Sequence, residues 1–254
     1  MPTYQTWAQT SWQQPFEDCG INGSITIYDY NRQVWMTSDM ADSQVGTLPA
    51  STFKILNTLI VLETGAIADD HEIIPWISDY DTTKYGHRPS IYKDMDLEEA
   101  FYKSAGWAYR ELAKKVGDER YLEILTEIGY GNGDLSIDDP DFWNYGAFQV
   151  TPTNQVQTMM DIFEEKLPFS PEAYSTLKRL MITEEGEGYV IRAKTGWTRA
   201  GGRDTGWWVG YLTTEDNVYF FATRLIKDRN DPTPNFGNCR KEITKAIFQQ
   251  MGVL

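Results

Sequence analysis

Segments with strand patterns occur at both ends of this chain of 254 residues, and a long helical stretch lies between them. The strand candidates are 24–28, 34–37, 189–193, 207–212 and 218–225, each bounded by polar or glycine-rich turns. The first two form a predicted hairpin that turns at 29–32. Because the strands flank the helices in sequence, the pattern favours an α+β fold whose sheet is assembled from both termini around an inserted helical lobe.

Helical patterns fill the middle of the chain and its last part. In 51–63, apolar residues recur at helical spacing, and Gly65 follows as the expected residue after the helix end. The other helix candidates are 97–115, 121–128, 154–165, 171–181 and 240–251. No repeat, low-complexity segment or linker marks a boundary, so we expect residues 1–254 to form a single domain.

The charge balance and hydropathy exclude two classes of partner. A formal net charge of −14 argues against a nucleic-acid partner, because phosphate attracts the opposite sign. The mean hydropathy is −0.48, and the chain has no apolar run near the roughly 20 residues that span a bilayer, so no membrane segment is expected. The first residues also lack the basic start and apolar stretch of a signal peptide, which predicts a cytosolic protein or one whose leader has been removed.

Histidine and cysteine are scarce, and this limits the possible chemistry. His71 and His87 lie in polar, loop-like sequence where solvated side chains are expected. We therefore expect no multi-histidine metal centre. The base of any enzyme here is expected to be Lys, Glu or Tyr. Cys19 and Cys239 are too few and too far apart for a zinc site or a CxxC motif.

A Ser-x-x-Lys motif opens the first long helix candidate, where Ser51 and Lys54 fall on one helical face. A lysine amine kept neutral by burial can take the proton from a serine hydroxyl in the positive field of a helix N-terminus. The spacing arises by chance about once in a chain of this length. A capping serine followed by a surface lysine is therefore the alternative.

A second motif, Lys194-Thr195-Gly196-Trp197, ends a predicted strand. On an edge strand the lysine and threonine offer a cation and a hydroxyl to a substrate carboxylate, and the glycine lets substrate approach the backbone. An ordinary strand end with a glycine turn is the alternative. Ser-x-x-Lys near the N-terminus with Lys-Thr-Gly near the C-terminus is the signature pair of serine β-lactamases and penicillin-binding proteins.

Further motifs make the sequence resemble the class D β-lactamases, the oxacillinases, from about Phe16 to the C-terminus. In the family's order and spacing they are Pro49-Ala50-Ser51-Thr52-Phe53-Lys54-Ile55, Tyr130-Gly131-Asn132, Phe142-Trp143 with Gly146, Lys194-Thr195-Gly196-Trp197 and Gly206-Trp207-Trp208-Val209-Gly210. Tyr-Gly-Asn in place of Ser-Asp-Asn separates class D from class A. The resemblance implies a five-stranded antiparallel sheet flanked by helices, with the active serine between the sheet and a mainly helical lobe.

The resemblance implies a catalytic role for each matching residue. Ser51 corresponds to the nucleophile that forms an acyl-enzyme, and Lys54 to the lysine that class D enzymes carry as an N-carboxylated general base. Trp143 corresponds to the tryptophan whose indole N–H holds that CO2-derived carbamate. Ser104 corresponds to the serine that passes a proton to the leaving nitrogen, with Lys194 beside it.

Substrate contacts follow from the same resemblance. Backbone N–H groups of Ser51 and Trp197 form the implied oxyanion hole, and Thr195 and Gly196 belong to the substrate-binding strand. Arg240 falls where family members bind the substrate carboxylate, and an arginine that merely forms surface ion pairs is the alternative. No metal and no cofactor besides the carbamate is implied.

Other motif residues have structural alternatives, and one position departs from the family. The alternatives are a core aromatic for Trp143, a simple turn for Tyr130-Gly131-Asn132-Gly133, and packing residues for Trp207 and Trp208. The chain reads Ser104-Ala105-Gly106 where the family's middle motif is Ser-x-Val. Loss of that apolar wall beside Lys54 either admits water for deacylation or disfavours the carbamate.

The sequence therefore predicts a metal-free serine hydrolase that opens the amide of penicillin-type β-lactams. A β-lactam sensor or penicillin-binding protein that deacylates slowly, or a non-catalytic binding module, is the alternative. The expected partner is a small β-lactam, the protein a monomer or homodimer, and the compartment periplasmic or secreted. Family topology places Cys19 and Cys239 within bridging distance, with two unpaired thiols as the alternative.

Overall fold

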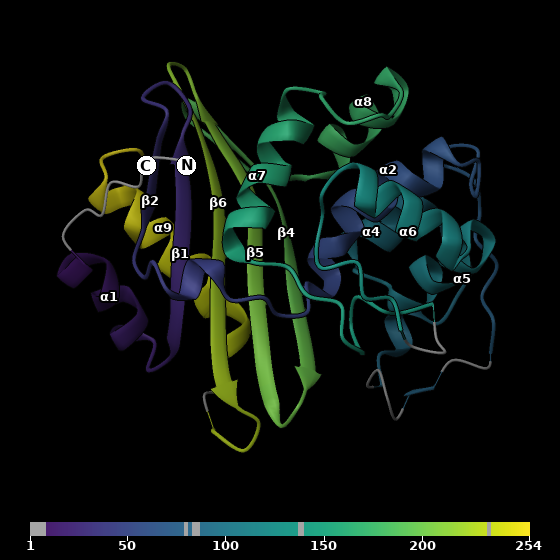
Figure 1. Ribbon diagram of the computed structural model, residues 1–254, viewed down its shortest axis with the longest axis horizontal. Helices are drawn as coiled ribbons and strands as arrows, with labels where there is room; N and C mark the ends of the chain where they lie inside the picture. Colours follow the sequence, from purple (N-terminus) through teal and green to yellow (C-terminus); the bar gives the residue numbers. More distant parts are fainter. Residues whose placement is uncertain (1–8, 79–80, 83–86, 137–139, 233–234) are drawn as a thin grey trace.

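The strand segments from the two ends of the chain form one antiparallel sheet, as predicted (Figure 1). The computed structural model describes residues 9–254 except 79–80, 83–86, 137–139 and 233–234, so the first residues and their signal-peptide expectation lie outside it. The strands are β1 (Asn22–Asp29), β2 (Val34–Thr37), β3 (Ile182–Gly186), β4 (Tyr189–Ala200), β5 (Arg203–Thr214) and β6 (Val218–Asp228). Their order is β2-β1-β6-β5-β4-β3, so N-terminal β1 pairs with C-terminal β6.

The sheet has six strands, and the expectation of five is wrong. The additional strand, β3, lies at the edge and pairs with the first part of β4. Four of its five residues are exposed, and Ile182 is its only apolar residue apart from the glycine. A strand without alternating apolar residues carries no periodic signal, which is why the sequence pattern missed it.

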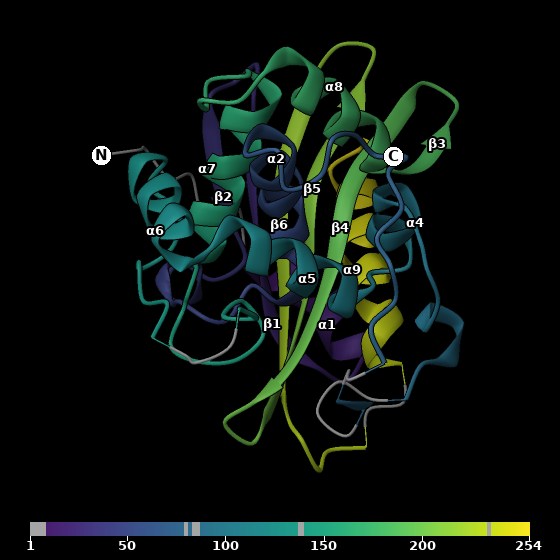
Figure 2. The same ribbon diagram turned by 90° about the vertical axis from the view of Figure 1, so that its right-hand side faces the viewer.

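Helices cover both faces of the sheet (Figures 1 and 2). The helices of the described residues are α1 (Gln9–Asp18), α2 (Lys54–Glu63), α4 (Leu97–Tyr102), α5 (Gly106–Val116), α6 (Asp118–Glu127), α7 (Pro152–Phe163), α8 (Pro171–Leu180) and α9 (Phe236–Gln250). Short 3-10 turns are η1 (Asp42–Gln44), η2 (Ala50–Phe53) and η3 (Pro89–Ile91). In Figure 1, α1 and α9 lie on one side of the sheet, whereas α7 crosses the other side and α2, α4, α5, α6 and α8 form the predicted helical lobe.

Two helices differ from the prediction. The single helix expected over 97–115 is two helices, because Ser104 between them has a φ of 54°. A left-handed residue cannot continue a right-handed helix. Helix α1 was not predicted, since its sequence is weakly apolar and contains Pro15, which usually breaks a helix.

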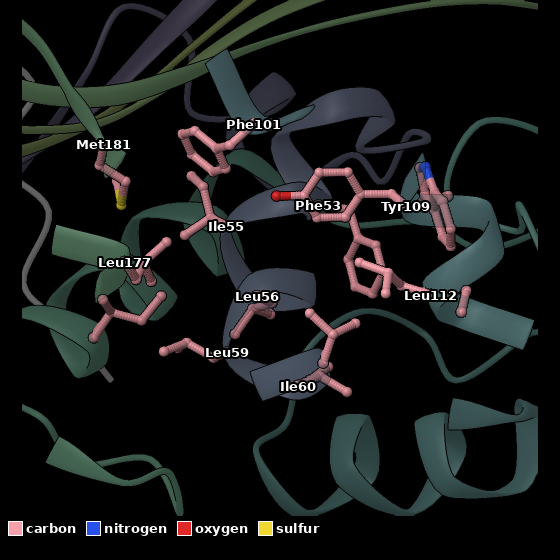
Figure 3. Packing of buried hydrophobic residues seen from close by; sticks show 14 of the residues in the cluster. Phe53, Ile55, Leu56, Leu59, Ile60, Phe101, Tyr109, Leu112, Leu177 and Met181 are labelled. Atoms are coloured by element: carbon pink, nitrogen blue, oxygen red, sulfur yellow. The ribbon is translucent and has the colours of Figure 1, made fainter. Parts of the chain in front are cut away.

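The sheet separates two hydrophobic clusters, because successive residues of a strand point to opposite faces. Trp207 belongs to the cluster shared with the lobe and α7, whereas Trp208 belongs to the cluster beneath α1 and α9. Both indoles are fully buried, so each packs within its cluster instead of facing a substrate, as predicted. Figure 3 shows the centre of the larger cluster, where Leu56 and Ile60 of α2 lie near Leu112 of α5. Helix α2 is thus fixed on several sides.

A disulfide joins Cys19 and Cys239, which confirms the bridged alternative. Cys19 lies just before β1, and Cys239 lies in the first turn of α9 after β6. The pairing of β1 with β6 brings these two positions together although 220 residues separate them in sequence. Within the described residues, none of the helices has the length and apolar character needed to cross a membrane.

Candidate active site

The side chains of Ser51 and Lys54 meet where the chain enters the helical lobe. Residues Ala50–Phe53 form η2 and Lys54 begins α2, so the serine lies in a 3-10 turn before the α-helix instead of opening it. The Lys54 amine lies 3.0 Å from Ser51 Oγ. The serine is partly accessible, whereas the lysine has no exposed surface. The alternative of a surface lysine is therefore wrong.

The surroundings of Lys54 favour its neutral amine. Burial lowers the pKa of Lys54 to about 8, although the Asp141 carboxylate opposes this shift, and the Arg88 cation adds to it. The centroid of the Tyr109 ring lies 5.2 Å from the amine. With a pKa near 8, about one-tenth of the amine is neutral at pH 7, against a negligible fraction for an ordinary lysine. Lys54 can therefore accept a proton from Ser51.

A second serine–lysine pair lies close to the first. Lys194 Nζ donates a hydrogen bond to Ser104 Oγ at 3.1 Å, and it lies 3.3 Å from the carbonyl oxygen of the half-buried Thr195. Burial, followed by the cations of Lys54 and Arg240, holds the pKa of Lys194 well below its usual value. Ser104 occupies the break between α4 and α5, so the break in the predicted helix turns this hydroxyl toward the sheet.

The Lys-Thr-Gly motif lies within β4, because the strand extends beyond 194–197, and the prediction that it ends the strand is wrong. β3 pairs only with residues 189–192 of β4, so residues 194–197 of the motif are not paired with β3. A Cβ atom on Gly196 would lie 2.8 Å from the carbonyl oxygen of Pro49 and 3.1 Å from the methyl group of Thr52. The glycine therefore lets β4 approach the turn that carries Ser51, a reason the sequence did not suggest.

Trp197 and Arg240 form one side of the site. Trp197 is 38% exposed, and its indole donates to Asp204 Oδ2 at 3.2 Å. Arg240 is only 9% exposed, donates to the carbonyl of Gly237 at 2.9 Å and also to that of Gly196. Burial lowers the pKa of Arg240 to about 10. The alternative of surface ion pairs for Arg240 is therefore wrong, because backbone carbonyls hold the guanidinium against β4.

Trp143 lies behind the serine turn. The backbone N–H of Ala50 donates to the carbonyl of Trp143 at 2.9 Å, and the indole stacks on Phe53 with centroids 5.3 Å apart. Trp143 is thus a core aromatic, yet its buried Nε1–H has no acceptor within the described part of the chain. Leaving a buried donor unpaired costs about 1–3 kcal/mol. The residues present therefore fit a further buried acceptor at the Trp143 indole, such as a carbamate on the amine of Lys54.

A buried polar chain that the sequence analysis missed supports the serine turn. Gln155 accepts a hydrogen bond from the Tyr130 hydroxyl at 3.1 Å and donates to Thr52 Oγ1 at 2.9 Å. Thr52 in turn donates to the carbonyl of Pro49 at 2.6 Å. No local pattern marks Gln155, because its two partners lie 25 and 103 residues away in sequence.

The rest of the Tyr-Gly-Asn motif holds a neighbouring segment. Gly131 has a φ of 75°, and Asn132 accepts from the backbone of Gln149 and donates to the carbonyl of Ala147. The alternative of a simple turn is therefore wrong, since the motif connects two distant segments. Gly106, the position that departs from the family, begins α5.

Two histidines lie at the surface, and an arginine that was not predicted lies near Ser104. His71 and His87 are exposed, as expected. Arg88 was not predicted, and its Nη2 donates to the carbonyl of Lys103 at 2.8 Å, next to Ser104. Its charge lowers the pKa values of both site lysines, so it belongs to the electrostatic environment of the site. The only sequence signal for a role of Arg88 in the site is its basic side chain.

Comparison with known proteins places the chain in a family. Residues 23–249 match the family described as penicillin binding protein transpeptidase domain. The chain is 32% identical to β-lactamase OXA-48 of Klebsiella pneumoniae over 244 residues, which cover 96% of this chain and 89% of that protein. It is 31% identical to β-lactamase OXA-10 of Pseudomonas aeruginosa over 248 residues, which cover 96% and 90%.

Solved structures agree with these relatives. The class D β-lactamase of Sebaldella termitidis superposes with a TM-score of 0.90 at 35% identity, covering 99% of this chain and 100% of that chain. The class D β-lactamase YbXI from Nostoc superposes with a TM-score of 0.88 at 35% identity, covering 96% and 99%. The chain belongs to the class D serine β-lactamases, within the penicillin-binding-protein transpeptidase family.

Proposed function

We propose that this protein hydrolyses the amide bond of penicillin-type β-lactams through an acyl-enzyme on Ser51. The contact of 3.0 Å between Ser51 Oγ and the buried amine of Lys54 carries this proposal. A serine nucleophile needs a base within hydrogen-bond distance, and Lys54 meets that condition with a lowered pKa. The relatives named as β-lactamases support the same reaction.

In the acylation step, Lys54 takes the proton of Ser51 as Oγ attacks the carbonyl carbon of the lactam. The C–N bond of the ring then breaks, and Ser104 gives its proton to the departing nitrogen. Lys194, hydrogen-bonded to Ser104 at 3.1 Å, stabilises the resulting oxygen and returns a proton. Backbone N–H groups of Ser51 and Trp197 stabilise the negative charge that develops on the carbonyl oxygen.

The cations around the serine suit an anionic substrate. Arg240 donates to the carbonyl of Gly196, two residues from Lys194 along β4. Burial and neighbouring cations lower the pKa of Lys194, but a bound carboxylate favours its ammonium form, so both side chains are cationic when an anion is bound. With the hydroxyl of Thr195, they bind the carboxylate that penicillins carry on the fused ring. Gly196 keeps the adjacent backbone free of a side chain. A cationic site in a chain of net charge −14 concentrates anions at this position on the surface.

We further propose that Lys54 carries an N-carboxy group formed from CO2. Where present, the group would supply the carboxylate base both for the proton of Ser51 and for the water that hydrolyses the acyl-enzyme, in place of the free amine. Two observations support it: the buried amine of Lys54 with a pKa of about 8, and the Trp143 N–H that lacks an acceptor among the described residues. Trp143 would hold the group by donating from Nε1. The proposal includes no metal and no other cofactor.

Gly106 favours one alternative, a protein that is acylated but deacylates slowly, as a β-lactam sensor or penicillin-binding protein does. The residue begins α5 close to Ser104 and offers no apolar wall beside the site. An apolar side chain at this position would lower the pKa of Lys54 further below about 8, and its absence leaves more of the ammonium form, which cannot react with CO2. The two readings differ only in the second half of the reaction.

The experiment that separates these possibilities is a stopped-flow and steady-state assay with the chromogenic cephalosporin nitrocefin. Continuous turnover supports hydrolysis. A burst of one equivalent per protein followed by no turnover supports the slowly deacylating alternative, and no reaction supports a non-catalytic binding module. Ser51→Ala serves as the control for uncatalysed colour development.

For compartment and assembly, we propose a periplasmic or secreted protein that is a monomer or homodimer and binds neither nucleic acid nor membrane. The disulfide between Cys19 and Cys239 supports an oxidising compartment. The net charge supports the absence of a nucleic-acid partner. Cell fractionation tests the compartment, and light scattering after size exclusion tests the assembly.

A further inference from the structure

The backbone before Ser51 is held in a strained conformation. Ala50 has a φ of 52°, in the left-handed region that residues with a Cβ rarely occupy. Such a conformation is unfavourable and persists only where the surrounding structure enforces it. We therefore expect contacts from other elements of the fold to hold segment 42–48, which leads into this turn.

Arg224 of β6 holds the first part of this segment. Its Nη1 donates to the carbonyl of Val45 at 2.6 Å and contacts Thr47 Oγ1 at 3.3 Å, and its Nη2 donates to the carbonyl of Asp42 at 2.9 Å. The Asp42 carboxylate pairs with the same Nη2. Ser24 of β1 donates to that carboxylate. The Arg224 guanidinium thus binds two backbone carbonyls of segment 42–48 and holds the segment against the sheet.

Trp207 of β5 holds the second part. Its indole Nε1–H donates to the carbonyl of Leu48 at 3.0 Å, two residues before Ala50. The guanidinium carbon of Arg224 lies over the Trp207 ring, 5.3 Å from its centroid, so the two side chains make a cation–π contact. They form one support that spans the entering segment from Asp42 to Leu48.

The chemistry of Arg224 argues for a role beyond packing. The side chain has no exposed surface, and its Nε–H has no acceptor within the described part of the chain. Burying a charge together with an unpaired donor is costly, and a well-packed apolar side chain often stabilises a fold as well or better. The planar fork of arginine, however, directs several N–H groups at fixed angles, which an apolar chain cannot do.

We propose that Arg224 and Trp207 are positioning residues for the nucleophile, holding segment 42–48 so that Ser51 Oγ stays within 3.0 Å of the Lys54 amine. This inference rests on the proposed acyl-enzyme on Ser51. Neither side chain touches the reacting atoms, so both act through the backbone that leads to Ala50. Their loss changes the geometry before the attack, whereas in the acyl-enzyme the covalent bond itself fixes the serine oxygen.

Two matched indoles provide the test. Trp207→Phe removes the donor to Leu48 and keeps an aromatic ring, whereas Trp208→Phe makes the same change at the next residue, whose buried Nε1 has no acceptor among the described residues. We expect Trp207→Phe to lower the rate of acylation by nitrocefin at least tenfold in single-turnover experiments, with deacylation changed less than threefold. Trp208→Phe should leave both rates within threefold of the wild type.

Arg224→Lys and Arg224→Met extend the test to the guanidinium. We expect Arg224→Met to lower acylation more than tenfold and Arg224→Lys to restore part of it, measured well below each variant's unfolding temperature. If Arg224→Met does not fold, Trp207→Phe against Trp208→Phe decides alone. Unchanged acylation in Trp207→Phe, or equal losses in both tryptophan variants, would overturn the inference. Failure of the wild type itself to form an acyl-enzyme would instead overturn the proposed function.

Discussion

The amine of Lys194 donates to Ser104 Oγ at 3.1 Å, which joins the sheet to the helical lobe across 90 residues of sequence. The same distance, within about 0.1 Å, separates Lys54 from Ser51. Ser51 and Lys54 both lie where η2 meets α2, whereas Lys194 comes from β4 and Ser104 from the lobe, so the second pair exists only when the sheet and the lobe are packed together. Catalysis is therefore coupled to the docking of these two parts.

Ser51→Ala should abolish covalent labelling by a fluorescent penicillin, because the attacking oxygen is lost. The side chain is partly accessible in the 3-10 turn before α2 and donates no side-chain hydrogen bond within the described residues, so the unfolding temperature should change by no more than a few degrees. Gel fluorescence and thermal unfolding measure the two effects. Undiminished labelling of the variant would remove Ser51 from the mechanism.

Lys54 should carry a carbamate that is loosely held. In 13C-bicarbonate, we expect a carbamate NMR signal that is lost in Lys54→Met, and a steady-state rate that rises with added bicarbonate. Trp143→Phe should weaken the signal and slow deacylation more than acylation, since the indole N–H is the donor available to the group. If turnover is brisk without any carbamate signal, Lys54 acts as a plain amine.

Gly106→Val tests why the carbamate is loosely held. An apolar side chain at the start of α5 should exclude water near Lys54 and reduce the dependence on bicarbonate, because desolvation favours the neutral amine. Steady-state rates with and without bicarbonate measure this. An equal or stronger dependence in the variant would show that Gly106 does not loosen the group.

The buried amine of Lys54 should make stability depend on pH. Its pKa is about 8 in the folded protein and 10.5 for an exposed lysine, so the unfolded chain binds more protons between these values. The destabilisation is fully present below about pH 8 and is relieved as the pH rises toward 10.5, by about 3 kcal/mol in total. Denaturant unfolding in CO2-free buffer should show this gain in the wild type and lose it in Lys54→Met. Parallel curves for the two proteins would contradict it.

Arg240→Ala should remove the preference for a substrate carboxylate. In the wild type, kcat/KM for benzylpenicillin should be about 10–100 times that for its methyl ester, because only the acid can form a charge-assisted contact with Arg240. In the variant, kcat/KM for the acid should fall to near that for the ester, whose value should change little. Comparing both substrates separates carboxylate binding from the support that Arg240 gives to Gly196. A retained preference for the acid would assign the carboxylate to other groups.

Cys19→Ser should lower the free energy of unfolding by about 4–5 kcal/mol, because the bridge closes a loop of more than 200 residues in the unfolded chain. Cys239→Ser and the double variant should be destabilised to the same extent, since any of the three breaks the same bond. Thiol titration of the unreduced, denatured wild type should find no free thiol. Additive effects of the two single variants would contradict a shared bond.

Much of the site was predictable because its chemistry is local in sequence. Ser51 and Lys54 are three residues apart, and Lys194 to Trp197 form one short motif, so each half of the site has its own pattern. The strand patterns at both ends also predicted how the sheet is assembled. The structure added the distances that make these residues partners.

The parts that were missed depend on contacts distant in sequence or on weak patterns. Gln155 and Arg224 act through partners more than 100 residues away, which no periodicity reports. The break at Ser104 follows from its left-handed conformation inside an otherwise helical pattern. β3 is too polar to show the alternating apolar pattern of a strand. Pro15 lies inside α1, and a proline normally argues against a helix, so α1 was not predicted. Tertiary packing overrides local preference at each of these positions.

The pairing of β1 with β6 also determines when the molecule can fold. Residues 22–29 are made long before their partners at 219–226. Until then, β1 and β5 each present an unpaired sheet edge, which is a template for aggregation. The sheet cannot close before β6 has been made, and closure over such a sequence distance is slow, so both edges stay open to aggregation until β6 inserts between them.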